Sequence, residues 1–169
     1  MSIFVSPFMA ARRRQSHCSE HLKHMANVVC EISVTPVPLA ARMSDIAGAG
    51  AVVDFWGVVR PTENGREIEG IDYEAHHEMA EHQLKGIAEQ AADRFGLRLV
   101  IVHHRIGFIR VEEPSLFLRV ACPHRSEGFR ASQWIVEELK KKVPIWKRPR
   151  FKVESHRHAS HADRVGITV

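Results

Sequence analysis

The sequence predicts one α+β (mixed α/β) domain with antiparallel strands and two main helices. Short β-branched runs alternate with two longer segments of helical periodicity, and turn signals between some of the runs indicate hairpins. The chain has 169 residues, a length that suits one domain with a core of useful size. Hydrophobic residues make up 44% and charged residues 26%, which is ordinary for a soluble globular protein.

The two ends of the chain differ from its middle. Residues 1–26 are interpreted as an N-terminal extension outside the fold, because they begin with the Arg-rich, acid-free stretch MSIFVSPFMAARRRQSHC. This extension is a targeting presequence, a dispensable disordered segment, or the result of a start upstream of the true one at Met25. The single domain is expected over residues 27–154, and residues 155–169 form a histidine-containing tail.

Strands and turns dominate the first half of the domain. Residues 28–34 alternate and are β-branched, which predicts a strand, and the following TPVPLAARMSDIAGAG leaves room for one short helix. A largely apolar strand is expected over residues 51–59, where Gly57 marks a bulge or a close backbone approach. The Asn-Gly pair in RPTENGRE predicts a hairpin turn, and residues 68–75 alternate as the returning strand.

The second half adds two substantial helices. The stretch HHEMAEHQLKGIAEQAADRFG has apolar residues at helical spacing and is closed by Gly96 as a C-cap. Strands are expected over residues 97–107 and 115–123, with a turn-rich link between them. The second helix is expected over residues 126–142, and its final cations suit a helix C-terminus.

Composition limits the classes of function. No apolar run approaches the ~18 residues that cross a bilayer, so no membrane partner is expected. The net charge of +4 favours an anionic partner or substrate but is too small to indicate nucleic acid by itself. The three cysteines lack CxxC spacing, which favours reduced thiols in a cytoplasmic protein over disulfides or a zinc site.

Adjacent histidines do not predict a metal site. Neighbouring residues on a strand point to opposite faces, so neither His76–His77 nor His103–His104 forms a chelate. The tail HRHASHAD could bind a metal adventitiously, but no functional metal is expected.

Two places along the chain have the residues of an anion site. In CPHRSEGF, Ser126 is expected to cap the second helix, whose first N–H groups together with His124 and Arg125 would bind an anion. The alternative is a surface pair that only caps the helix. Arg60, at the end of a strand, either reaches a ligand or is a solvated loop residue.

The segment KKKVPIWKRPRFK, residues 140–152, is the strongest concentration of positive charge. Pro144 prevents the helix from continuing. The apolar residues between positions 143 and 146 would pack the segment onto the body and hold Lys147 in a fixed place. A lysine that is partly desolvated among like charges has a lowered pKa and can act as a nucleophile or base. The alternative is a basic helix end followed by a solvated tail.

Five segments together resemble the large, catalytic subunit of molybdopterin synthase over about residues 29–150. They are GAVVDFWGVVR, IDYEAHHEMAEHQL, LVIVHHRIG, CPHRSEGF and EELKKKVPIWK, in this order and spacing. The resemblance implies an α/β hammerhead-type domain that forms a homodimer, the core of a heterotetramer with a small ubiquitin-like sulfur carrier ending in a Gly-Gly thiocarboxylate. It implies a sulfurtransferase of molybdenum cofactor biosynthesis that builds the molybdopterin dithiolene on cyclic pyranopterin monophosphate. This pterin is a substrate, and no cofactor or metal is implied for the subunit.

The resemblance also implies which residues act. Lys140 and Lys147 are expected to be catalytic, with Lys140 closest to the thiocarboxylate and Lys147 and Arg60 holding the pterin. The implied substrate-binding set is Val58, Val59, Arg60, His124, Arg125, Lys140, Lys147, Arg148 and Pro149. The N-terminal extension and the chain beyond residue 150 are not part of the resembling pattern.

Helix geometry adds one constraint on this site. His124 and Lys140 lie at opposite ends of one expected helix, which separates them by roughly 24 Å at 1.5 Å per residue. They are too far apart to reach one small substrate from a single chain. A two-fold dimer would bring the His-Arg end of one subunit to the lysine end of its mate, which predicts a composite site at the dimer interface.

A different class of function uses the same basic segment. A non-catalytic module could bind RNA or another polyanion through residues 140–152. Such modules interleave exposed aromatic residues for base stacking, and only Trp146 and Phe151 are candidates here. A stand-alone nucleotide-binding enzyme is disfavoured because the chain has no Gly-rich phosphate loop.

Overall fold

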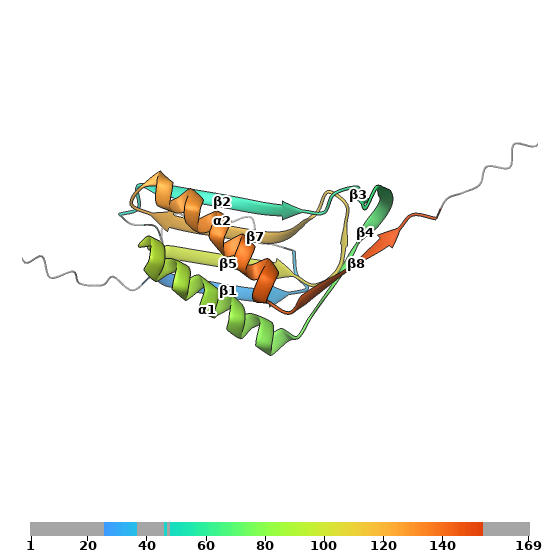
Figure 1. Ribbon diagram of the computed structural model, residues 1–169, viewed down its shortest axis with the longest axis horizontal. Helices are drawn as coiled ribbons and strands as arrows, with labels where there is room; N and C mark the ends of the chain where they lie inside the picture. The colour runs from blue at the N-terminus through green and yellow to red at the C-terminus, as the bar shows by residue number, and fades with distance from the viewer. Residues whose placement is uncertain (1–25, 37–45, 47, 154–169) are drawn as a thin grey trace, which may run out of the picture.

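Two β-sheets and two helices make up the part of the chain that the computed structural model describes, residues 26–36, 46 and 48–153 (Figure 1). The tail, nearly all of the N-terminal extension, and most of the short helix expected before residue 50 lie outside this part. No helix in the described part is long and apolar enough to cross a membrane.

The first sheet has four strands in the order β1-β5-β7-β2. They are β1 (Asn27–Ser33), β2 (Ala51–Val58), β5 (Leu99–Arg105) and β7 (Pro114–Cys122). β1 pairs with β5 in parallel, whereas the β5–β7 and β7–β2 pairs are antiparallel. The mixed sheet and the two helices confirm the predicted α+β class.

Helices α1 (His77–Phe95) and α2 (Arg125–Lys142) cover one face of this sheet (Figure 1). Small and branched apolar residues of α1 recur at helical spacing and are buried, from Ala80 through Leu84 and Ala88 to Ala91. The helix ends at Gly96, which is left-handed at φ 62° as its predicted C-cap role requires. The main core lies between the helices and the sheet.

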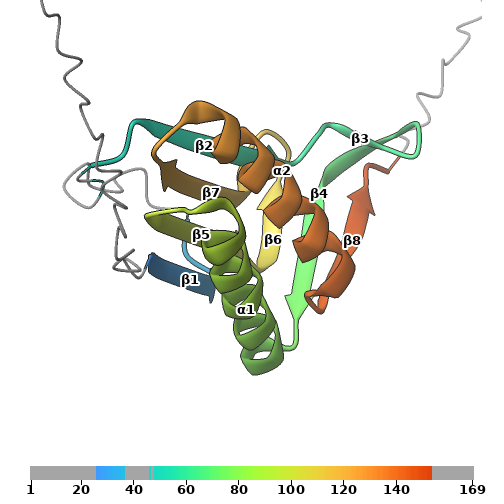
Figure 2. The same ribbon diagram turned by 60° about the vertical axis from the view of Figure 1, so that its left-hand side comes forward.

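The second sheet is built around β4 (Arg66–Ala75). This strand pairs with β3 (Thr62–Glu63), β6 (Gly107–Arg110) and β8 (Ile145–Phe151), always antiparallel. Figure 2 shows β4 and β8 running across the end of the first sheet instead of alongside it. A smaller core of Val59, Ile68, Ile71 and Ile109 belongs to this region.

The structure corrects the predicted pairing of the second strand. The Asn64–Gly65 turn is confirmed, with φ of 52° and 76°, but it joins β3 to β4, and β2 pairs with β7. The predicted bulge is confirmed, because the β2–β7 register shifts between Gly57 and Val58. The expected strand over residues 97–107 ends early, where Gly107 at φ 84° redirects the chain into β6.

Gly70, in the middle of β4, provides a test of the second sheet. A Cβ at this position would lie 2.3 Å from the carbonyl oxygen of Ile109, so we expect Gly70→Ala to lower the free energy of unfolding by about 1–3 kcal/mol. Gly86→Ala is the matched control. Apart from Gly86, its chain neighbours and its own helix backbone, no atom in the described part of the chain lies within 4 Å of a Cβ added there in α1. Better helix propensity should therefore raise stability by roughly 0.5–1 kcal/mol. Urea denaturation measures both. Equal stability of Gly70→Ala and the unmodified chain would contradict the close β4–β6 contact.

Candidate active site

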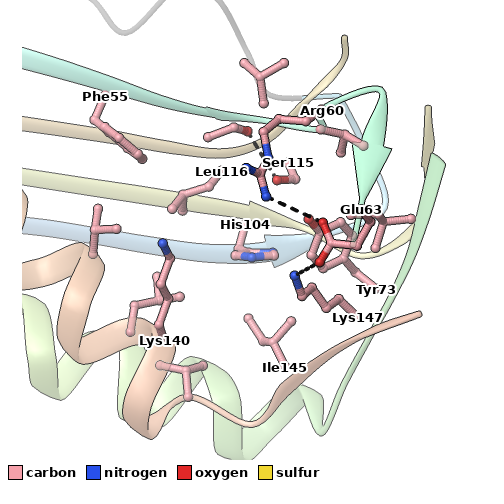
Figure 3. A pocket seen from close by; sticks show the side chains of 17 residues that line it. Phe55, Arg60, Glu63, Tyr73, His104, Ser115, Leu116, Lys140, Ile145 and Lys147 are labelled. Atoms are coloured by element: carbon pink, nitrogen blue, oxygen red, sulfur yellow. Dashed lines mark hydrogen bonds and ion pairs between the residues drawn. The ribbon is translucent and has the colours of Figure 1, made fainter. Parts of the chain in front are cut away.

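A cavity of about 520 Å³ opens between the two sheets, beside the C-terminal end of α2 (Figure 3). Apolar side chains such as Phe55, Leu116 and Ile145 form much of its wall. Among them stand three cations and four other polar side chains. These are Arg60, Lys140, Lys147, Glu63, Tyr73, His104 and Ser115. A cavity with apolar walls and a few convergent charges is suited to a flat, anionic organic ligand.

The chain reverses direction at the end of α2 and so delivers two lysines to this cavity. The N–H of Val143 donates to the carbonyl of Leu139 at 3.0 Å and closes the helix, and Pro144 prevents another turn. The chain then enters β8, which pairs with β4 from its first residue and carries Lys147 opposite Tyr73. Lys140 therefore comes from a helix end and Lys147 from a strand, on two sides of one space.

Lys140 is not neutralised within the part of the chain that the structure describes. The next two residues, Lys141 and Lys142, pair with Glu138 at 3.4 and 2.5 Å, on the outer side of the helix. Each helical residue is turned by about 100° from its neighbour, so Lys140 points elsewhere. Its side chain enters the cavity (Figure 3), where its amine is available to a ligand.

Glu63 holds the other two cations. Its Oε1 accepts a hydrogen bond from Lys147 Nζ at 2.5 Å, and its Oε2 lies 3.6 Å from the Arg60 guanidinium. The hydrogen bond from Lys147 keeps the pKa of Glu63 below its ordinary value, so the carboxylate is ionised at neutral pH. The concentration of like charge predicted around Lys147 is thereby relieved. Because Glu63 lies beside two cations, an anionic ligand would be favoured at the same place.

The basic run after α2 is a strand whose cations are paired, and the alternative of a solvated tail is wrong. Four of them form ion pairs with acidic residues of β3 and β4, at N–O distances from 2.5 to 3.0 Å. The pairs are Lys147–Glu63, Arg148–Glu74, Arg150–Asp72 and Lys152–Glu67. Alternation along β8 turns Lys147 toward the cavity, whereas Arg148 pairs on the opposite face. Trp146 does not anchor the segment, because it is 56% exposed.

His124 and Arg125 lie at the other end of α2. The helix begins at Arg125 with His124 as its N-cap residue, so the expected capping role of Ser126 is wrong. The Ser126 hydroxyl instead donates to the carboxylate of Glu127 at 2.8 Å. His124 and Arg125 line a separate shallow depression together with Gly50, Pro123 and Ser126. Within a single chain, His124 and Arg125 therefore lie outside the lysine cavity.

Neither described cysteine is available for sulfur chemistry. Cys30 and Cys122 are free thiols, in line with the prediction, while Cys18 lies outside the described residues. Burial raises the pKa of Cys30 to about 12 and also raises that of Cys122. Both thiols are protonated at neutral pH, so neither is a thiolate nucleophile.

Comparison with protein families decides the identity of this fold. A model of the family described as MoaE protein matches residues 31–142, more than half of the chain. The chain belongs to the MoaE protein family. The resemblance seen in the sequence is therefore confirmed.

Curated MoaE-family relatives share one name, molybdopterin synthase catalytic subunit. The relative from Pyrococcus abyssi is 40% identical over 124 residues, which cover 70% of this chain and 84% of that protein. The relative from Thermoplasma volcanium is 36% identical over 127 residues, covering 73% and 92%. These relatives support a molybdopterin synthase catalytic subunit, an enzyme, over the alternative of a polyanion-binding module.

Solved structures agree with this assignment. Molybdopterin synthase from Staphylococcus aureus matches with a TM-score of 0.67 and 33% identity, over 72% of this chain and 90% of that one. A complex of subunits 1 and 2 of molybdopterin-converting factor from Helicobacter pylori matches with a TM-score of 0.54 over 76% and 91%. Its identity is 16%, so that likeness concerns the fold alone.

The MoaE fold brings together some of the predicted site residues and separates others. The cavity gathers Val58, Val59, Arg60, Lys140 and Lys147. The remaining predicted residues do not line it. They are His124 and Arg125 at the far end of α2, and Arg148 and Pro149 further along β8.

Four polar residues of the cavity are absent from the site predicted from the sequence, namely Glu63, Tyr73, His104 and Ser115. Glu63 belongs to a polar loop where nothing but its place three residues after Arg60 distinguishes it. In the sequence, His104 stands out only as half of an adjacent histidine pair that does not form a chelate. Strand alternation does turn it away from His103, as predicted, and that same alternation puts it on the inner face, at the cavity.

Proposed function

We propose that this chain, as the catalytic subunit of a molybdopterin synthase, transfers sulfur from the thiocarboxylated C-terminus of a small ubiquitin-like partner to cyclic pyranopterin monophosphate. The product is the dithiolene of molybdopterin. The observation that carries the proposal is the cavity beside α2, where the amines of Lys140 and Lys147 enter one apolar-walled space from two elements. The proposed reaction uses no metal or resident cofactor and takes place in the cytoplasm.

The lining suggests a division of roles. The apolar wall around Phe55 and Leu116 suits a flat pterin ring, and Arg60 and Lys147 suit its anionic groups. Lys140, which has no carboxylate partner in the described part of the chain, is left for the reacting acyl group. There it would act in proton transfer or in transient capture of the acyl carbon.

A second copy of the chain is part of the proposal. A phosphorylated pterin favours a further anion site, and His124 and Arg125 at the start of α2 provide N–H groups and a cationic fork. They lie roughly 24 Å from Lys140 along the helix axis. We therefore place the His124–Arg125 end of one subunit against the lysine cavity of its two-fold mate.

The small partner supplies the sulfur. The solved complex from Helicobacter pylori joins subunits 1 and 2 of molybdopterin-converting factor, and this chain shares a fold with that structure, so a comparable pairing is part of the proposal. Two small partners on a homodimer of this chain would form a heterotetramer.

Reconstitution tests the proposed function directly. The full chain, a thiocarboxylated small partner ending in Gly-Gly, and the cyclic pterin precursor are mixed, and dithiolene formation is followed. We expect product only when all three are present and the partner carries the thiocarboxylate. A partner with an ordinary carboxylate is the matched control. Absence of product with the complete mixture would refute the proposed function.

Removal of the Glu63 charge tests how the cavity binds its substrate. Because Glu63 neutralises Lys147 and Arg60, we expect Glu63→Gln to tighten precursor binding about threefold to tenfold, or roughly 1 kcal/mol. Titration calorimetry of the chain with the precursor measures the change, which should shrink at high salt. Glu74→Gln, which removes the carboxylate paired with Arg148 on the other face of β8, is the control. Weaker binding in Glu63→Gln would mean that Glu63 serves instead to position Lys147.

A further inference from the structure

His104 faces the cavity from β5, and the roles given above leave it unused. Its side chain is buried, and in the view of Figure 3 the ring stands at the cavity wall with the amines of Lys140 and Lys147 on either side. Its Nδ1 lies 2.8 Å from the carbonyl oxygen of Arg105. A carbonyl oxygen only accepts hydrogen bonds, so Nδ1 carries the hydrogen.

The other ring nitrogen is therefore the basic one. In a neutral imidazole with its hydrogen on Nδ1, the lone pair is on Nε2. No residue in the described part of the chain hydrogen-bonds to this atom, and Nε2 is not among the described polar atoms that are buried without a partner. Tyr73 packs edge-on against the ring, with centroids 5.4 Å apart at 69°, and fixes its plane.

The surroundings keep this imidazole neutral. Burial lowers the pKa of His104, and the neighbouring His103 adds to the effect, although its side chain points away toward Ser33. Other titratable or charged groups face the cavity from each element packed around the ring. These groups are Arg60, Glu63, Tyr73, Lys140 and Lys147. Glu63 is already paired with two of the cations, so it does not compensate a positive charge on His104.

After sulfur transfer, the C-terminal acyl group of the small partner must be released from the sulfur by a nucleophile. The inference about this release rests on the proposed function. Once the thiocarboxylate sulfur has bonded to the pterin side chain, a thioester joins the substrate to the last glycine of the partner. Water then adds to the acyl carbon, the carbon–sulfur bond breaks, and its electron pair remains on sulfur as a thiolate. The water loses one proton as it forms the new carboxyl group, and nothing is oxidised or reduced.

We propose that His104 is a catalytic residue of this step, its Nε2 taking the proton of the attacking water and returning it to the thiolate or to solvent. The position of the ring at the wall of a largely apolar cavity, between the two lysines, places a base where the acyl group must be released. The cationic neighbours would stabilise the negative charge that develops on the acyl oxygen.

His104→Asn tests the proposal. The asparagine amide can still donate to the Arg105 carbonyl from near the Nδ1 position, but it has no atom in place of Nε2. We expect single-turnover dithiolene formation at pH 7 to fall about 10²- to 10⁴-fold. The thioester adduct of partner and pterin should accumulate and be visible by intact mass spectrometry of the quenched mixture. A merely structural role would not produce this adduct.

His103→Asn is the matched control, because His103 is equally buried on the same strand but bonds to Ser33 on the opposite face. Its single-turnover rate should stay close to that of the unmodified chain. Circular dichroism and binding of the small partner show whether each variant is folded.

The pH profile of the unmodified chain gives a second measurement that does not depend on a variant. His104 is a base only when neutral, and burial lowers its pKa, so the rate should fall with acid only at a pH below the ordinary histidine range. The variant should lack this acid limb. Because a lowered histidine pKa also costs stability as the pH falls through it, folding is monitored at each pH.

The outcomes separate this inference from the proposed function. If the unmodified chain makes no dithiolene, the proposed function fails and this step falls with it. If the unmodified chain is active, a folded His104→Asn variant with an unchanged rate and no adduct overturns the role of His104 alone. Should the variant not fold, a rate of the unmodified chain that stays constant from pH 7 down to the lowest pH at which the chain remains folded also overturns it.

Discussion

Lys140→Ala is expected to reduce sulfur transfer about 10²- to 10⁴-fold, with little change in fold. The reason is the position of its amine, which enters the cavity and has no acidic partner in the part of the chain that the structure describes. Alanine removes the proton donor or nucleophile and leaves the helix intact, since alanine is a strong helix former. Single-turnover dithiolene formation in the reconstituted mixture measures the loss.

Lys141→Ala is the matched control for this variant. It removes the same charge from the same helix end, but Lys141 is largely exposed and pairs with Glu138 outside the cavity. We expect its rate to remain within about twofold of the unmodified chain, because an exposed ion pair contributes little. Lys140→Arg keeps the charge without a transferable proton, and it should stay as slow as the alanine variant if the amine takes part in the chemistry. Full activity in Lys140→Ala would overturn the proposed mechanism.

A mixture of Lys140→Ala and His124→Ala chains is expected to regain activity that neither variant has alone. The His124 depression and the Lys140 cavity lie at opposite ends of α2, so a shared site must take one residue from each subunit. In a mixed dimer, one of the two shared sites then keeps both residues and the other loses both. Random mixing makes about half of the dimers mixed, which predicts about one quarter of full activity.

The measurement needs the mixed dimer as a defined species. Two different affinity tags on the two variants allow it to be isolated, and each variant purified alone supplies the background rate. Mixtures that stay at this background would show that both residues serve the site of a single chain, and the composite site would be wrong. Light scattering checks that the isolated species is a dimer.

The structure gives the cations of the basic segment, residues 140–152, different environments that the sequence does not distinguish. As sequence this segment is a run of cations interrupted by apolar residues. In the structure its lysines have unlike environments, because Lys140 ends a helix and enters the cavity, whereas Lys147 sits on a strand and binds Glu63. Most of the remaining cations are matched by acids of β4, which leaves less unpaired charge for the phosphates of a nucleic acid.

Local patterns were enough to predict much of the secondary structure. The helix ending at Gly96, the helix up to Lys142 and the turn at Asn64–Gly65 all rest on interactions between residues close in sequence. β8 was missed because its inward residues, Ile145 and Phe151, alternate with cations, and such a pattern is stable as a strand only beside the acids of β4.

Local patterns did not predict which distant strands pair with each other. The turn at Asn64–Gly65 predicted a hairpin between residues 51–59 and 68–75. Instead, β2 pairs with β7, which lies more than fifty positions further along the chain. No turn signal marks β7 as the partner, since β4, α1, β5 and β6 all lie between β2 and β7 in the chain. The choice depends on which arrangement buries the face of the sheet under α1 and α2.

The sequence alone was sufficient for the family and the fold class, because motif order and helical periodicity are properties of the chain itself. It also singled out Lys140 and Lys147, which the structure places at one cavity. The tertiary structure alone decided which polar groups share a cavity. Glu63 and His104 come from segments about forty residues apart, and both line one cavity with Lys147 because the second sheet crosses the end of the first. Separation along the sequence does not predict which polar side chains lie close together in space. The packing of apolar faces brings distant segments together, and the polar residues on those segments follow.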